Sequence, residues 1–116
     1  FEVDKDLYSF LQAKFIKELD SKRLSLYLGD VLEFWNTNSS LYNGRYDLIA
    51  NLPYYIATNI ILKALEDNNC EHIIVMVQKE VANKFCANSL DKDFSSLSII
   101  TKLIAKQAQI RSEEHT

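Results

Sequence analysis

A short stretch around the chain's one proline combines an amide, an extended backbone and an aromatic ring. It reads Asn51-Leu52-Pro53-Tyr54 and lies between an apolar run and a helical pattern. Pro53 has no N–H and disfavours helix at Leu52, so the Leu52 carbonyl can point into a crevice. The Asn51 carboxamide and this carbonyl offer two acceptors for an exocyclic NH2 group, and Tyr54 offers a face for a flipped base. The stretch predicts a pocket for the amino edge of a nucleobase.

Two carboxylates occupy positions comparable to that of Asn51. Glu2 and Asp30 each come one step after an apolar segment that can form a strand. In open α/β sheets, ligands bind at the carboxyl ends of the strands. If the three segments are neighbouring strands of one sheet, these three side chains line one crevice.

The elements that would position these residues alternate between strand and helix. Residues 1–4 are predicted to be the end of a strand, and further strands are predicted at 24–30, 46–50 and 72–77. One predicted helix is capped by Asp4 or Asp6, and the others cover 58–67, 79–87 and 95–106. The first helix is expected to gather its apolar side chains on one face: Leu7, Phe10, Leu11, Phe15 and Leu19. Thr58 is expected to cap the second helix, and residues 36–45 to form a loop. This order predicts an α/β fold with a mainly parallel sheet, in which 72–77 is buried on both faces.

Composition restricts the class of protein. A chain of 116 residues fits one small domain or part of one. Its net charge of −3 argues against binding nucleic acid by bulk charge, so any basic surface is local or lies elsewhere. No apolar run reaches the roughly 18 residues of a membrane span, and no signal peptide opens the chain. We therefore expect a cytoplasmic protein without a membrane partner.

The cysteines and histidines indicate neither a disulfide framework nor a metal site. Cys70 and Cys86 are far apart and form no C-x-x-C pair, and with His72 and His115 they show no metal-ligand spacing. We expect reduced, buried thiols and no bound metal.

Segments spread along the chain resemble the ribosomal RNA adenine N6-dimethyltransferase family. They are F-E-V-D-K-D-L, G-D-V-L-E-F, N-L-P-Y, and V-Q-K-E-V-A-N-K-F with L-S-I-I beyond it. They occur in the family's order, and the resemblance covers about residues 1–110. It implies a Rossmann-like fold that uses S-adenosylmethionine, here incomplete, with a mainly parallel sheet flanked by helices.

The resemblance also implies residue roles on the cofactor side. Glu2, with Val3 beside it, would accept hydrogen bonds from the ribose hydroxyls of S-adenosylmethionine. Asp30 would accept from the cofactor's adenine amino group, with the Val31 backbone next to it. Asn51 would border both the cofactor and the target base.

On the substrate side, the resemblance assigns the catalytic positions to the quoted stretch. Asn51 and the Leu52 carbonyl would hold the target adenine N6, Pro53 would keep the backbone extended, and Tyr54 would stack on the base. Tyr55 receives no role. The implied reaction is the dimethylation of adjacent adenines in small-subunit (16S-type) rRNA, which contributes to ribosome biogenesis.

Two other functions remain possible interpretations beside rRNA dimethylation. A DNA adenine or other amino methyltransferase usually carries Pro where this chain has Leu52, which argues against it. A non-catalytic RNA-binding assembly or transcription factor could keep the same fold, although the intact Asn51 and Tyr54 argue against loss of chemistry. The small ribosomal subunit is the expected partner, and a monomer is favoured.

The chain is expected to be an internal segment. The family's glycine-rich loop, N-terminal arm and C-terminal helical domain find no match here, and Ser95 and Ser96 stand where the family commonly has Gly and Arg. We expect 1–110 to be a partial catalytic domain that is inactive alone. Residues 111–116, R-S-E-E-H-T, match a translated sequencing adapter and are expected to be a non-native tail.

Overall fold

The computed structural model describes residues 1–93 and 95–104 and divides the chain into two compact units. The first unit covers Phe1–Leu41, and the second begins at Tyr42. The predicted adapter-like tail at 111–116 lies outside the described residues.

The first unit opens with two short helices. Helix α1 covers Lys5–Lys14, and Asp4 caps it as predicted by accepting hydrogen bonds from the backbone N–H groups of Asp6 (2.8 Å) and Leu7 (3.1 Å). Helix α2 covers Ile16–Asp20.

The apolar face predicted for one continuous helix is divided between these two helices. The interruption falls at Phe15, the C-cap of α1 and the N-cap of α2. The side chains of Leu7 and Phe10 are exposed, whereas those of Leu11 and Leu19 are half-buried. The predicted stripe is therefore present in the sequence but does not form a buried core in this unit.

The strand predicted at 24–30 is wrong except at one point. The segment forms a single parallel bridge between Leu28 and Glu2, with hydrogen bonds from Glu2 N to the Tyr27 carbonyl (2.9 Å) and from Gly29 N to the Glu2 carbonyl (2.8 Å). The Leu–polar alternation is real, but a strand needs a continuous partner, and the stretch before Asp4 supplies only one residue. Gly29 has φ 152°, a backbone conformation that residues with a side chain rarely adopt. The chain leaves the bridge at this residue.

The sequence reasoning missed a helix directly after this bridge. Helix α3 covers Val31–Thr37 and buries Trp35. Its N-cap is Asp30, whose carboxylate Oδ1 accepts from the Leu32 backbone N–H at 2.8 Å. The predicted loop at 36–45 therefore begins later, at Asn38.

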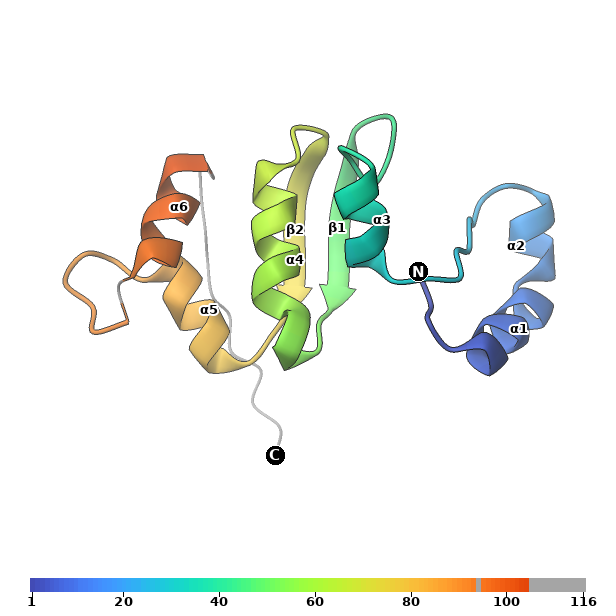
Figure 1. Cartoon of the computed structure of the whole chain (residues 1–116), viewed down its shortest axis with the longest axis horizontal. Coiled ribbons are helices and arrows are strands. Elements are labelled where there is room, and N and C mark those ends of the chain that lie inside the picture. The colour runs from blue at the N-terminus through green and yellow to red at the C-terminus, as the bar shows by residue number, and fades with distance from the viewer. Residues whose placement is uncertain (94, 105–116) are drawn as a thin grey trace. The chain divides into compact units, whose positions relative to one another are not determined.

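The second unit is built on two parallel strands. Strand β1 covers Tyr46–Asn51 and strand β2 covers Cys70–Met76, joined by helix α4, Tyr54–Glu66. In Figure 1, α4 lies in front of β2, with β1 beside it, and the buried face of α4 is Ala57, Ile60, Ile61 and Ala64. The α/β class with a parallel sheet is confirmed.

Helix α4 begins one turn earlier than predicted. The expected cap was Thr58, but the helix starts at Tyr54 with Pro53 as its N-cap, at φ −60° and ψ 142°. A helix start leaves N–H groups without partners anyway, so the missing N–H of proline costs nothing there. Pro53 thus ends the extended chain and begins the helix in one step.

Strand β2 is not buried on both faces among the described residues. Half-buried residues alternate with exposed ones, and Ile74 and Met76 are 63% and 53% exposed. The reason is that α4 packs on one face of the two-stranded sheet. Within the described part of the second unit, no element covers the other face, which carries Ile49 of β1 and Ile74 and Met76 of β2.

Two further helices follow, both as predicted. Helix α5 covers Lys79–Cys86 and α6 covers Ser96–Ile104, and they pack on each other. Ser98 of α6 is fully buried and donates its hydroxyl hydrogen to the Lys84 carbonyl. The last two positions of the predicted 95–106 helix lie outside the described residues. Within the described part of the chain, every helix is too short or too polar to cross a membrane.

The turn between α4 and β2 is tied to the beginning of β1. Asp67, only 6% exposed, accepts from the Tyr46 hydroxyl at 2.6 Å and from the Asn69 backbone N–H at 3.0 Å. The Tyr46 N–H donates to the Asn69 carbonyl at 2.9 Å. Burial is the larger cause and the hydrogen bond to Asp67 the next, and together they raise the pKa of Tyr46 well above its usual value. The phenol therefore stays a hydrogen-bond donor.

We predict that Tyr46→Phe lowers the free energy of unfolding by about 1 to 2 kcal/mol, because a buried carboxylate loses a donor. Urea unfolding of the protein measures this, and Tyr55→Phe, at an exposed tyrosine, is the matched control with an effect below about 0.5 kcal/mol. Equal stability of the two variants would show that the turn does not depend on this hydrogen bond.

A second prediction separates the capping role of Asp30 from its charge. Asp30→Ala should lower the free energy of unfolding by about 1 kcal/mol, whereas Asp30→Asn should change it by a few tenths, because asparagine is an equally good N-cap. Urea unfolding again reports the difference. If Asp30→Asn is as damaging as Asp30→Ala, the cap does not hold α3.

Candidate functional site

The acceptors predicted at the end of β1 are where the sequence placed them. Asn51 is the last residue of the strand, is exposed, and pairs in register with Met76. The pairing continues one residue further, because the Leu52 N–H donates to the Met76 carbonyl at 3.0 Å. Among the described residues, no donor reaches the Leu52 carbonyl oxygen, which therefore keeps its capacity to accept a hydrogen bond.

The aromatic part of the motif belongs to the first turn of α4. The Pro53 carbonyl accepts from the N–H groups of Ile56 (3.2 Å) and Ala57 (3.1 Å), which closes the turn directly after the proline. Tyr54 and Tyr55 are the first residues of the helix and are 67% and 74% exposed. Tyr54 thus presents its ring close in sequence to both acceptors, on a backbone fixed by helix and strand.

The backbone segments that carry the two carboxylates predicted for the cofactor pair with each other in the first unit. The bridge between Glu2 and Leu28 places Glu2 beside the chain that leads into Asp30. Val3 is exposed after Glu2, and Val31 is the half-buried first residue of α3. The structure therefore brings these four residues to one end of the bridge.

Both carboxylates already accept local hydrogen bonds. Glu2 Oε1 accepts from the Asp4 N–H at 3.2 Å, and Asp30 Oδ1 accepts from the Leu32 N–H at 2.8 Å. A carboxylate has about four lone-pair positions on two oxygens, so each has capacity for a ligand. These contacts fix the direction of the carboxylates in advance.

An aromatic cluster supports this part of the site. The ring centroid of Phe1 lies 5.2 Å from that of Tyr27 and 5.2 Å from that of Phe34, and the Tyr27 and Phe34 rings are 6.0 Å apart. Such pairs add stability beyond the area they bury. The cluster joins three segments. Phe1 directly precedes Glu2, Tyr27 lies in the bridge segment that leads to Asp30, and Phe34 lies in α3, which Asp30 caps.

The predicted single crevice stays a prediction. Glu2, Val3, Asp30 and Val31 lie in the first unit, whereas Asn51 to Tyr54 lie in the second. The structure brings each group together within its own unit.

Both cysteines are free thiols, as expected, but they are half-buried rather than buried. Burial raises the pKa of the Cys70 thiol and of the Cys86 thiol. A raised pKa leaves less of the nucleophilic thiolate near neutral pH, so neither residue has the character of a catalytic nucleophile.

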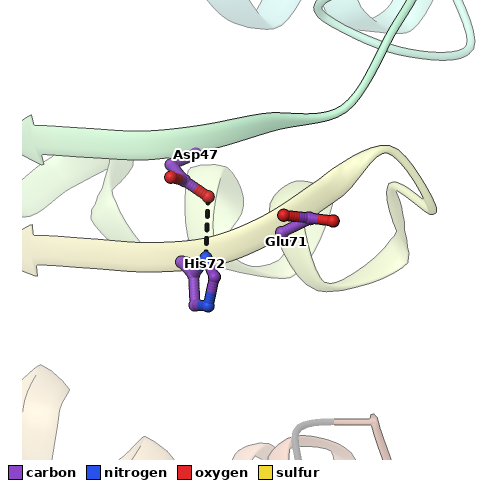
Figure 2. Close-up of side chains that lie close together, drawn as sticks. All are labelled: Asp47, Glu71 and His72. Atoms are coloured by element: carbon purple, nitrogen blue, oxygen red, sulfur yellow. Dashed lines mark hydrogen bonds and ion pairs between the residues drawn. The ribbon is translucent and has the colours of Figure 1, made fainter.

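Sequence reasoning missed a group of side chains at the other end of the sheet. Asp47 of β1 and Glu71 and His72 of β2 have ligand atoms within 4.8 Å of one another. Figure 2 shows the three side chains on the two neighbouring strands. His72 Nδ1 lies 2.8 Å from Asp47 Oδ1. The expectation of no metal rested on cysteine and histidine spacing. The signal that could have found the group was polar residues at the beginnings of two adjacent parallel strands.

Comparisons with known proteins agree with these motifs. The family model described as "Ribosomal RNA adenine dimethylase" matches residues 1–116. A protein named ribosomal RNA small subunit methyltransferase A from Aliarcobacter butzleri is 59% identical over 110 residues, which are 95% of this chain and 42% of that protein.

Further relatives carry the same name. The protein from Sulfurimonas denitrificans is 59% identical over 106 residues, 91% of this chain and 39% of the relative. The one from Campylobacter hominis is 49% identical over 106 residues, with the same shares of 91% and 39%. The chain spans about two fifths of the length of these curated relatives. The resemblance noted in the sequence is thereby confirmed: the chain belongs to the ribosomal RNA adenine dimethylase family.

Proposed function

We propose that this chain is part of an enzyme that dimethylates adenine N6 in small-subunit rRNA, with S-adenosylmethionine as methyl donor. The observation that carries the proposal is the geometry at the end of β1 in a chain of this family. There, an exposed amide, an available carbonyl and an exposed tyrosine ring follow one another directly. The relatives' printed names, ribosomal RNA small subunit methyltransferase A, support the substrate class.

The role of the motif follows from its two acceptors. The Asn51 side-chain oxygen and the Leu52 carbonyl would each accept one N–H of the adenine amino group. Holding both hydrogens turns the amine toward a tetrahedral shape and aims its lone pair out of the base plane. The ring of Tyr54 would stack on the extruded base and fix its plane. These residues thereby supply positioning rather than acid or base catalysis.

The first unit offers residues that fit the cofactor. The Glu2 carboxylate suits two ribose hydroxyls, and the Asp30 carboxylate suits an adenine amino group, since both are held in place and have further lone pairs. S-adenosylmethionine would supply a methyl group activated by a sulfonium. The amine lone pair would form the new N–C bond as the S–C bond breaks toward sulfur, and the N6 proton would then leave to water.

Acceptors around N6 also explain how transfer would be favoured electrostatically. Positive charge grows on N6 as the N–C bond forms, and both oxygens carry partial negative charge aimed at that atom. A second transfer needs a pocket that still admits N6-methyladenine. We infer that the small ribosomal subunit is the partner and the cytoplasm the working compartment, since that is where such rRNA is assembled.

We predict that Asn51→Ala lowers methylation of rRNA by at least about 100-fold in kcat/KM, because one acceptor of the amino group is lost. The test uses a full-length family protein that carries residues 1–110 of this chain as its matching segment, below called the full-length protein. It is incubated with labelled S-adenosylmethionine and unmethylated small subunits, and N6,N6-dimethyladenine is counted. Asn59→Ala, at an exposed amide on α4, is the matched control and should keep full activity.

The outcome separates this function from its alternatives. No label in rRNA from the unaltered full-length protein, with S-adenosylmethionine still bound, would contradict the proposal in favour of a DNA methyltransferase or a non-catalytic factor. Full activity of Asn51→Ala would contradict the assigned base pocket.

A separate prediction concerns the cofactor. Glu2→Gln should weaken S-adenosylmethionine binding by about tenfold or more, because hydrogen bonds to a charged acceptor contribute about 1.5 to 3 kcal/mol. Isothermal titration of the full-length protein measures the Kd, with Glu18→Gln at an exposed site of α2 as the control. An unchanged Kd in Glu2→Gln would remove Glu2 from the cofactor site.

A further inference from the structure

The group formed by Asp47, Glu71 and His72 stands apart from the proposed base pocket. Asp47 lies near the beginning of β1, whereas Asn51 ends that strand, and the register pairs Asp47 with His72 and Asn51 with Met76. The two places are therefore at opposite ends of the same strand pair. All three side chains are exposed, and their ligand atoms lie within 4.8 Å of one another (Figure 2).

An irregularity in the sheet brings the three side chains together. Tyr46 pairs with Cys70, but the next residue, Asp47, pairs with His72, so Glu71 is an extra residue on β2. In a regular strand, Glu71 and His72 would point to opposite faces. At this bulge both are exposed, in the same part of the sheet as Asp47. A bulge of this kind re-aims a side chain at the expense of regular pairing.

We propose that Asp47, Glu71 and His72 form a binding site for a divalent transition metal ion of the zinc type. One imidazole nitrogen and two carboxylate oxygens are ligands that Zn²⁺ accepts, and three protein ligands leave a position open for water. Ligand atoms around a tetrahedral zinc ion lie about 3.4 Å apart, as follows from bond lengths of about 2.1 Å. The exposed side chains need to move by only about 1 Å to reach that arrangement. The hydrogen bond between His72 Nδ1 and Asp47 gives way to the ion.

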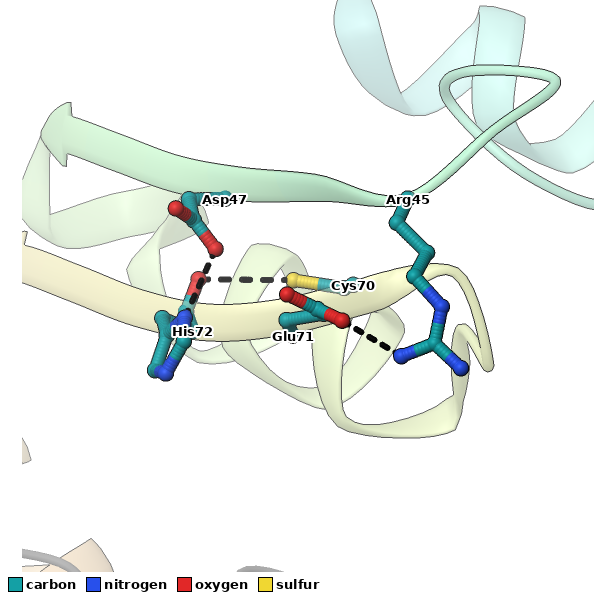
Figure 3. Close-up of polar contacts among 5 residues, drawn as sticks. All are labelled: Arg45, Asp47, Cys70, Glu71 and His72. Atoms are coloured by element: carbon teal, nitrogen blue, oxygen red, sulfur yellow. Dashed lines mark hydrogen bonds and ion pairs between the residues drawn. The ribbon is translucent and has the colours of Figure 1, made fainter.

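Arg45 is the competitor that the site must displace. Figure 3 shows its guanidinium directed at Glu71, with which it forms an ion pair, and the two side chains are 80% and 40% exposed. Exposed ion pairs contribute little to stability, so a divalent cation can take the Glu71 carboxylate from Arg45. This competition gives the site a signature that nonspecific binding to surface acids lacks, because removing a positive charge should strengthen metal binding here.

A metal ion at this place would join the beginnings of the two strands. Asp47 lies on β1, while Glu71 and His72 lie on β2, so an ion bound by all three adds a cross-link to the parallel pair. An ion that binds only the folded state stabilises it by RT ln(1 + c/Kd) at ion concentration c, so the unfolding temperature rises with the logarithm of the ion concentration once this exceeds Kd. The expected effect is on stability and not on methyl transfer.

The test is a titration of the metal-free full-length protein with Zn²⁺. Calorimetry measures the Kd, and the shift in Tm with added Zn²⁺ measures the stabilisation. We expect one site with a Kd in the micromolar range. His72→Ala should weaken binding by at least tenfold, and Asp47→Asn should also weaken it. Arg45→Gln should strengthen binding several-fold, and Glu66→Gln, an exposed acid on α4, should leave it unchanged. Tm values without metal confirm that the variants fold.

Results of two kinds would overturn the site. One is a Kd for Zn²⁺ in the millimolar range or weaker in the unaltered protein. The other is binding that His72→Ala leaves unchanged, which would assign the ion to other groups. The titration does not use rRNA or S-adenosylmethionine, so its outcome is independent of the proposed methyltransferase activity.

Discussion

The parallel pairing of β1 with β2 is the constraint on which the proposed base pocket depends. It runs in register from Asp47 to Asn51, and the hydrogen bond from the Leu52 N–H to the Met76 carbonyl extends it past the end of the strand. That bond holds the chain extended up to the proline. Because Pro53 then starts α4 at once, the acceptors and the Tyr54 ring are fixed from both sides by regular structure. A site on such supports holds its geometry better than one on a free loop.

In the first unit, the carboxylates that make local hydrogen bonds are the same ones that are proposed to bind the cofactor. Asp30 caps α3, and Glu2 accepts from the chain that enters α1. The helix dipole favours a carboxylate at a helix N-terminus, and its hydrogen bond orients the Asp30 side chain before any ligand arrives. The aromatic cluster of Phe1, Tyr27 and Phe34 supports both carriers where a continuous strand pair is absent.

Much of the second unit could be predicted from the sequence, because its signals are local. The apolar run before Asn51 and the single proline each specify their element through neighbouring residues, as the cap at Asp4 does in the first unit. The parallel α/β order follows from the alternation of strands and helices. The family and its Rossmann-like fold were likewise recognisable from short motifs.

Several of the errors concern features that depend on partners far away in the chain. The Leu–polar alternation at 24–30 is a sound strand pattern, yet strand formation needs a neighbour, and only Glu2 provides one. Periodicity could not show that one face of β2 is exposed, since that depends on which elements pack there. The bulge at Glu71, beside which the ligand atoms of Glu71, His72 and Asp47 lie close together, is set by strand register, which no spacing rule in a single sequence reveals.

The long separation in sequence between Leu52 and its partner also orders events during synthesis. Met76 follows Leu52 only after the whole of α4 and the turn at Asp67. A growing chain therefore releases the Asn-Leu-Pro-Tyr segment well before the residue that holds it exists. Helix α4 can form before β2 is synthesised. The Asn51 carboxamide and the Leu52 carbonyl acquire their final direction only when β2 has been made and has paired with β1. The proposed pocket would be among the later features of this unit to be completed, although its motif is among the earlier parts of the unit to be translated.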